Sequence, residues 1–204
     1  PDADWFCWVS FPDPHHPWDP PASELHRVNW RDVDLPVGFP VDRAQREAIL
    51  DAKPAQWRKW YDGDFVSNYE APRRWVPNTL TEDQVREINA LTHIENELID
   101  EAVGRLMKHV ESRGWGADTD VLFSTDHGEF QGDFGLLFKG PYHVDSLMRV
   151  PLIWRPAPSA GIDPFGYLCA KCSNFLTKNV CITANANNIV ANTSIGEGFI
   201  WKLP

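Results

Sequence analysis

Two short stretches of this sequence contain side chains that can act together on an anionic ester. Asp126 and His127 are adjacent in the stretch from Ser124 to Glu129, and Lys139 follows soon after. A carboxylate and an imidazole are common metal ligands, and a lysine ammonium neutralises negative charge on a bound ester. Adjacent side chains can face one metal only on a turn, for which Gly128 gives the backbone freedom. The pattern predicts a metal site close to an anion-binding cation.

Each of these residues also has an ordinary structural interpretation. Asp126 can accept hydrogen bonds from the backbone that follows it in a turn, and Lys139 can be a solvated surface lysine. His15, in the run from Pro14 to Pro17, can be held by turn backbone alone. The occurrence of all of them in one chain favours the functional interpretation.

Composition limits the class of protein. The formal charge of -10 and the pI near 5.1 predict that the chain does not bind nucleic acid, which requires a basic face. No apolar run approaches the roughly 18 residues that cross a bilayer, so no membrane partner is expected. The expected partner is a small anionic ester, attracted by local cations and a metal. Composition leaves the oligomeric state and the compartment open.

One long amphipathic helix is the clearest predicted element. The sequence from Thr81 to Gln84 is a capping box, which marks a helix start, and Gly114 marks its end. Between them, apolar residues recur at helical spacing: Val85, Ile88, Leu91, Leu98, Ala102, Leu106 and Val110.

Short elements surround this helix. The aromatic run Trp5 to Phe11 predicts a buried strand, and Asp42 to Lys53 predicts a short helix bounded by Pro54. Asp120 to Ser124 and Val150 to Trp154 predict two further strands. Helices and strands therefore alternate, which is typical of the α/β class.

Polar residues follow two of the predicted strands. His15 comes soon after the first strand, and Asp126 with His127 comes directly after the strand that ends at Ser124. In open α/β sheets, ligands bind beyond the carboxyl ends of the strands. If these two strands are parallel, both clusters lie at one edge and share a pocket.

The four cysteines give a weak signal. Cys7 is alone in the first predicted strand, whereas Cys169, Cys172 and Cys181 lie near the end of the sequence. A structural zinc site requires four ligands, and no histidine follows this cluster. We interpret the cysteines as free, buried thiols.

Several stretches of the chain resemble the sulfatase family of the alkaline-phosphatase superfamily. The matching stretches are Ser10–Trp18, Ile99–Leu106, Ser124–Glu129 with Gly132–Asp133, Lys139–Gly140 and Arg149–Ile153. The resemblance implies an α/β fold with a mixed sheet flanked by helices, of which this chain holds an incomplete part. It also implies a metal-dependent hydrolase that cleaves sulfate esters.

The resemblance assigns roles to individual residues. Asp126 and His127 are similar to two metal ligands of the family, Lys139 to the lysine that contacts the sulfate, and His15 to the histidine beside it. His143 is a further candidate for the substrate pocket. We expect Lys139 and His15 to be catalytic, with His15 protonating the leaving oxygen. The cofactor is a divalent metal, which the resemblance favours as calcium, with manganese or zinc as alternatives.

The sequence also departs from the family pattern. Sulfatases form their nucleophile in a Cys/Ser-x-Pro-x-Arg motif and use an early Asp-Asp pair on the metal, and neither occurs here. Because both belong upstream in the family, residues 1–160 are expected to be the later part of a catalytic domain. Residues 161–204 form a tail with no assignment. This fragment alone is expected to be inactive.

Two alternatives remain. A metal with a lysine stabilises phosphoryl oxygens as well as sulfuryl oxygens, so the ester can be a phosphate or a phosphonate. The chain can also belong to a non-catalytic metal-binding relative that has lost the nucleophile.

Overall fold

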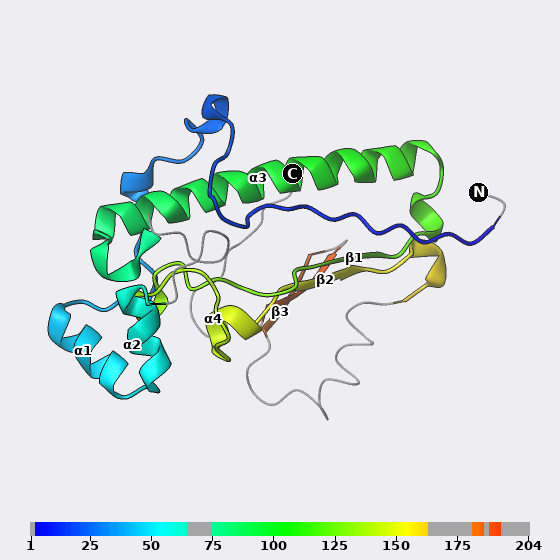
Figure 1. Ribbon diagram of the computed structural model, residues 1–204. Helices are drawn as coiled ribbons and strands as arrows, with labels where there is room; N and C mark the ends of the chain where they lie inside the picture. Colours follow the sequence, from blue (N-terminus) through cyan, green and yellow to red (C-terminus); the bar gives the residue numbers. More distant parts are fainter. Residues whose placement is uncertain (1–2, 65–74, 163–180, 186–187, 193–204) are drawn as a thin grey trace. The chain divides into compact units, whose positions relative to one another are not determined.

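The computed structural model describes residues 3–64, 75–162, 181–185 and 188–192. The helices are α1 (Arg43–Asp51), α2 (Ala55–Asp62), α3 (Glu82–Ser112) and α4 (Asp145–Met148), and the strands are β1 (Val121–Ser124), β2 (Leu152–Arg155), β3 (Cys181–Asn185) and β4 (Asn188–Asn192) (Figure 1). The chain divides into two compact units. One contains Pro1–Asp4, Arg105–Gly128 and Leu147–Pro204, and the other contains Trp5–Gly104 and Glu129–Ser146.

The long predicted helix is confirmed as α3, and its first turn is capped as the sequence indicates. Gln84 N–H donates to the Thr81 hydroxyl at 3.2 Å, and Thr81 N–H donates to the Gln84 side chain at 2.9 Å. The helix ends before Gly114, which has a φ of +74°. Its buried residues are Val85, Ile88, Ala90, Ile94 and Glu95. Leu106, predicted on the apolar stripe, is 41% exposed.

Helices α1 and α2 pack against each other (Figure 1). The predicted helix is confirmed as α1, whose N-cap Asp42 accepts the N–H of Gln45 at 2.7 Å. The following helix, α2, was not predicted. It begins directly after Pro54 and ends at Asp62, where Gly63 caps it with a φ of +84°.

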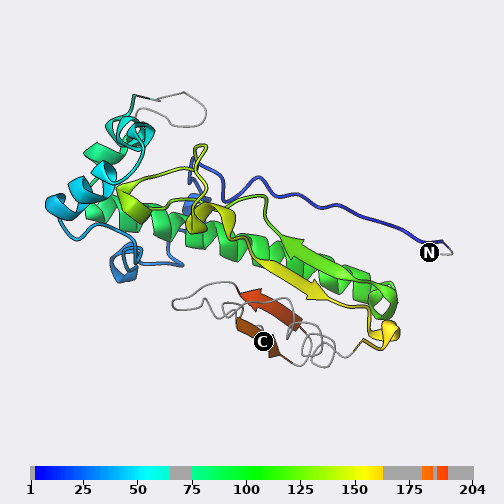
Figure 2. The ribbon, with the colours of Figure 1, turned by 90° about the horizontal axis from the view of Figure 1, so that it is seen from below.

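The sheet has the strand order β1-β2-β4-β3, and every neighbouring pair is antiparallel. Figure 2 shows β1 and β2 side by side. In the register of this pair, Phe123 lies opposite Ile153. Both strands were predicted. Strand β4 pairs with β2 through residues of the unassigned tail, most of which lies outside the described residues. The predicted domain boundary after residue 160 stays a prediction.

The predicted buried strand at Trp5 to Phe11 is wrong. This segment is extended, but within the described chain it joins no sheet, because no neighbouring strand supplies backbone partners. Its apolar side chains stay in water, with Phe6 85% and Trp8 79% exposed. Cys7 is exposed too, contrary to the prediction of a buried thiol. The expected pair of parallel strands is therefore not formed. Cys169 and Cys172 lie outside the described residues.

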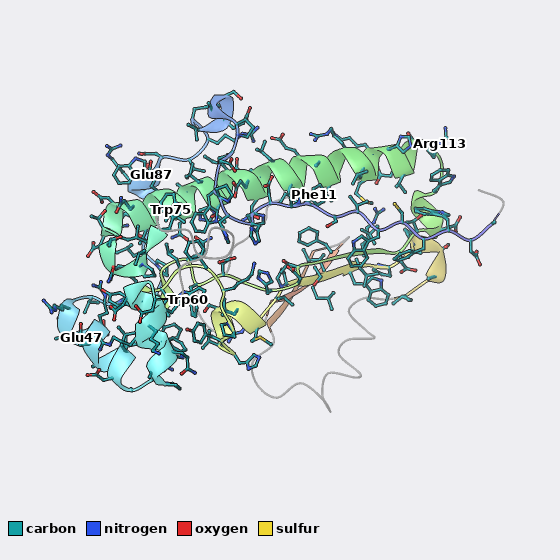
Figure 3. All side chains as sticks on the ribbon, in the orientation of Figure 1. Phe11, Glu47, Trp60, Trp75, Glu87 and Arg113 are labelled. Carbon is teal, nitrogen blue, oxygen red and sulfur yellow. The ribbon has the colours of Figure 1, made fainter. Side chains whose placement is uncertain are left out.

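Aromatic rings form the core of the unit that contains α2. This aromatic cluster comprises Trp57, Trp60, Phe130, Phe134 and Tyr142, with ring centres between 4.9 and 6.2 Å apart. Figure 3 shows Trp60 on α2. The cluster joins α2 to the loop between residues 128 and 145. No helix in the described ranges is both long and apolar enough to cross a bilayer.

Candidate functional site

His15 and Lys139 lie together in one compact unit, although 124 positions separate them. Lys139 Nζ is 2.8 Å from His15 Nε2, and His15 Nδ1 is 2.7 Å from the His16 carbonyl oxygen. A carbonyl only accepts, so Nδ1 carries the proton. An ammonium only donates, so Nε2 is the acceptor. We therefore assign His15 as a neutral imidazole that accepts a hydrogen bond from the Lys139 ammonium.

Lys139 lies between two residues with unusual backbone conformations. Phe138 has a φ of +64° and Gly140 a φ of +58°, so both neighbours of Lys139 are left-handed. For Phe138 this conformation is unfavourable and persists only because the surroundings impose it. The N–H of Phe130 donates to the Phe138 carbonyl at 2.9 Å, and Phe138 is only 1% exposed. The lysine thus extends from a rigid loop.

The ring of Phe138, which belongs to the lysine loop, also contacts residues near His15. His15 stacks on His16 with ring centres 4.2 Å apart, and His16 meets the edge of Phe138 at 4.8 Å. Trp18 stacks on Phe138 at 5.7 Å. His16 and Trp18 are both buried. Phe138 therefore holds the neighbours of both polar residues, and this packing keeps His15 beside Lys139.

His143 is not part of this pair. It is exposed on the loop that precedes α4, and within the described ranges it forms no hydrogen bond or ion pair. The structure leaves its predicted role as a pocket residue untested.

Asp126 and His127 belong to the other unit and lie on a turn after β1, where the sequence pattern placed them. The His127 N–H donates to Asp126 Oδ1 at 3.0 Å, and His127 Nε2 is 3.6 Å from Asp126 Oδ2. Desolvation acts against ionisation of Asp126, but His127, the turn N–H groups and the Thr125 hydroxyl together lower its pKa. The carboxylate is therefore the stable form.

The chemistry of this turn suits a metal, but only in part. His127 Nδ1 is 2.8 Å from the Gly128 carbonyl oxygen and must carry the proton, which leaves Nε2 as the ligand atom. The Asp126 side chain is 84% exposed, so its oxygens are accessible. In the described part of the chain, no group of three or more His, Cys, Asp or Glu could hold a metal. The turn thus supplies two ligands, whereas calcium takes six to eight oxygens and zinc four ligands.

Sequence reasoning missed Glu95, a carboxyl buried in α3 near the segment that carries His15. It follows Ile88 by two helical turns, so it occupies a core position of the apolar stripe. An acidic residue at such a position was the signal that could have identified it.

Curated relatives match most of this chain, although no model of a known protein family matches it. The chain is 30% identical over 161 residues to the uncharacterized sulfatase YidJ of Escherichia coli (strain K12), covering 76% of this chain and 27% of that protein. It is 27% identical to the multifunctional alkaline phosphatase superfamily protein PehA of Trinickia caryophylli, covering 75% of this chain and 29% of that protein. The chain thus spans less than a third of the length of these relatives.

Two solved structures share the fold. A phosphonate monoester hydrolase of Agrobacterium radiobacter matches with a TM-score of 0.63 and 26% identity, over 77% of this chain and 30% of that chain. The phosphonate monoester hydrolase SpPMH from Silicibacter pomeroyi matches with a TM-score of 0.58 and 23% identity, over 74% of this chain and 28% of that chain. These neighbours confirm the predicted fold class, as an incomplete domain.

Proposed function

Because this chain belongs to the sulfatase/alkaline-phosphatase superfamily, we propose that it forms the anion-binding part of a metal-dependent hydrolase that cleaves sulfate esters. The observation that carries the proposal is the 2.8 Å contact between Lys139 and His15. The ammonium and the imidazole extend from rigid segments and are both only partly buried, so an anion has access to them. Preorganised donors of this kind stabilise charge that develops on a transferred group.

Lys139 neutralises a non-bridging oxygen of the bound ester. When the ammonium turns to the ester, Nε2 of His15 loses its donor, and because His15 is only partly buried, Nε2 can take up a proton from solvent water. His15 can then donate that proton to the leaving oxygen, a step that typically contributes 100-fold or more, on the order of 10²–10⁴. His143 is proposed as a further contact to the part of the ester beyond the sulfate.

A divalent metal is proposed to bind Asp126 and His127, with calcium favoured over manganese or zinc. The ion would supply charge neutralisation at the ester oxygens. Further ligands must join these two before a hard cation is held firmly.

A second candidate changes the ester but keeps the chemistry. The relatives include a protein named as an alkaline phosphatase superfamily member and two phosphonate monoester hydrolases. Phosphate and phosphonate esters carry the same kind of anionic oxygens, so the Lys139–His15 pair serves them equally well.

Anion binding is the first test. ¹⁵N NMR of the purified chain would follow the His15 ring during titration with sodium sulfate, phosphate or methylphosphonate. We expect saturable shifts at His15 that Lys139→Met abolishes. Lys59→Met is the matched control, because Lys59 is exposed on α2 in the same unit. Identical titrations of both variants would contradict the proposal.

Turnover is the second test. The product of the whole reading frame that contains this chain would be assayed with p-nitrophenyl sulfate, p-nitrophenyl phosphate and p-nitrophenyl phenylphosphonate. Lys139→Met is expected to lower kcat/KM by roughly 100- to 1000-fold. The preferred ester distinguishes the two hydrolase candidates, and no turnover of any ester would favour a non-catalytic relative.

A further inference from the structure

Glu95 is a buried carboxyl that the proposed chemistry does not use. Glu95 is only 2% exposed and lies in the middle of α3. Oε1 accepts the backbone N–H of Asp19 at 3.0 Å. Oε2 is buried and has no hydrogen-bond partner among the described residues. Burying a carboxyl that has a single hydrogen-bond partner costs free energy. A structural role in the fold or at the site would explain why an acidic residue occupies this position.

The segment that Glu95 holds is the one that carries His15. It runs from Pro12 to Asp19, and the His15 N–H donates to the Pro12 carbonyl at 3.3 Å. The bond from Asp19 to Glu95 joins the far end of this segment to a helix that is 76 positions away in sequence. Because α3 is a long regular helix, it is a firm anchor for the end of the segment.

The charge state of Glu95 matters for this anchor. Burial, with a further contribution from the nearby Asp13 carboxylate, raises the pKa of Glu95 to about 8. The N–H of Asp19 opposes this shift, and the Asp19 carboxylate adds to it. The two carboxylates that face Glu95 therefore both belong to the segment itself, so ionisation of Glu95 creates repulsion across the anchoring bond.

We propose that Glu95 is a positioning residue for His15: its buried carboxyl accepts the Asp19 N–H, fixes the Pro12–Asp19 segment and so keeps the imidazole beside Lys139. The effect of Glu95 on anion binding rests on the proposed function, whereas its effect on the position of His15 does not. The position of His15 relative to Lys139 can be measured without any ligand.

Substitutions at Glu95 separate the anchor from its charge. Glu95→Gln retains a carbonyl oxygen that accepts the Asp19 N–H, and it is neutral at every pH. Glu95→Met removes the acceptor and keeps a similar volume. Glu87→Gln and Glu87→Met are matched controls, because Glu87 is exposed on the same helix two turns earlier (Figure 3). All four variants would be compared by ¹⁵N NMR of the Asp19 amide and the His15 ring.

The experiment is a pH series from about pH 6 to about pH 9 on the whole chain. In the unsubstituted protein, the Asp19 amide and the His15 ring are expected to shift together, with a shared inflection near the Glu95 titration. Glu95→Gln should abolish that inflection at both sites, and Glu95→Met should displace the His15 signals already at pH 7. The Glu87 variants should match the unsubstituted protein.

Two results would overturn the inference. One is an unchanged His15 ring in Glu95→Met, and the other is a shared inflection of the His15 ring and the Asp19 amide near pH 8 that persists in Glu95→Gln. If Glu95→Met does not fold, the comparison of Glu95→Gln with the unsubstituted protein still tests whether Glu95 positions His15. Sulfate titration at pH 7 adds a separate readout, in which Glu95→Met weakens binding by about tenfold or more. If sulfate binds no variant, the proposed function fails while the ligand-free pH series still tests the anchor.

Discussion

The indole Nε1 of Trp60 donates a 2.9 Å hydrogen bond to the carbonyl oxygen of Leu137, two residues before Lys139. The Tyr142 hydroxyl donates to the Gln56 carbonyl at 3.0 Å on the other side of the lysine. Helix α2 therefore holds the lysine loop from both ends. The positions of these four residues explain how a loop with left-handed residues keeps a single conformation.

Trp60→Phe removes the first of these bonds and keeps most of the ring packing. The buried Leu137 carbonyl loses its indole donor, which should lower the free energy of unfolding by about 1 to 3 kcal/mol. Urea denaturation followed by circular dichroism measures this change. Trp8→Phe is the control, since an indole that is 79% exposed should shift stability by no more than about 0.5 kcal/mol. Equal effects of the two substitutions would contradict the structural role of Trp60.

Gly140→Ala tests the backbone next to Lys139. Gly140 has a φ of +58°, and an added Cβ would lie 2.6 Å from Cε2 of Tyr142. We expect a loss of about 2 kcal/mol or more in the free energy of unfolding. Gly104→Ala is the matched control in α3, where an added Cβ meets nothing within 4 Å. That substitution should stabilise the helix by about 0.5 to 1 kcal/mol. The two changes should therefore have opposite signs in thermal melts.

The raised pKa of Glu95 predicts a pH dependence of stability. An ordinary glutamate titrates near 4.5, whereas folded Glu95 titrates at about 8. Below pH 4.5 Glu95 is protonated in both the folded and the unfolded protein, and its contribution to the free energy of unfolding is complete. As the pH rises toward 8, the unfolded state releases its proton first, so stability falls by on the order of 1 kcal/mol per pH unit. Above about pH 8 the contribution is lost.

Glu95→Gln should remove this slope. The difference in free energy of unfolding between Glu95→Gln and the unsubstituted chain should grow with pH and level off above about pH 8. Glu87→Gln should show no such growth, because Glu87 is exposed. Urea titrations at several pH values measure the slope, and parallel curves for all three proteins would show that Glu95 titrates normally.

Manganese provides a test of the Asp126–His127 turn. Mn²⁺ broadens NMR signals of nearby nuclei, so residues around the turn should broaden first in ¹⁵N–¹H spectra. Binding should be weak, because two protein ligands leave most coordination positions to water. Asp126→Asn should abolish the local broadening, whereas Asp118→Asn, at an exposed site in the same unit, should not. Broadening spread evenly over the exposed carboxylates would count against a site here.

Much of the local structure follows from patterns within single segments. The capping box at Thr81 and the Asp42 cap each place a helix start, because such caps satisfy orphan N–H groups with residues close in sequence. The turn at Asp126 and His127 is equally local. The resemblance of separate stretches also indicated the superfamily that the comparisons support.

Features that depend on distant partners were harder to predict. Helix α2 was missed because aromatic residues have only a modest helix propensity of their own. Packing of its tryptophans against the rings of Phe130 and Tyr142 stabilises the helix instead. The strand predicted at Trp5 to Phe11 failed for the converse reason. Its residues favour strands, but a strand exists only where a neighbour supplies hydrogen-bond partners. The contact of Lys139 with His15 spans too much sequence for a local pattern, and only the family resemblance indicated that the two residues lie together.

The exposed aromatic segment has a practical consequence for anyone who handles this chain alone. Phe6 and Trp8 alternate with Cys7 along an extended backbone, and all three are exposed. Extended apolar segments of this kind are templates for pairing between molecules, and an exposed thiol adds oxidative cross-linking. Concentrated samples without reductant should therefore aggregate and form disulfide-linked dimers. Cys7→Ser together with Trp8→Lys should reduce aggregation, prevent the cross-links formed through Cys7 and leave the Lys139–His15 pair unchanged.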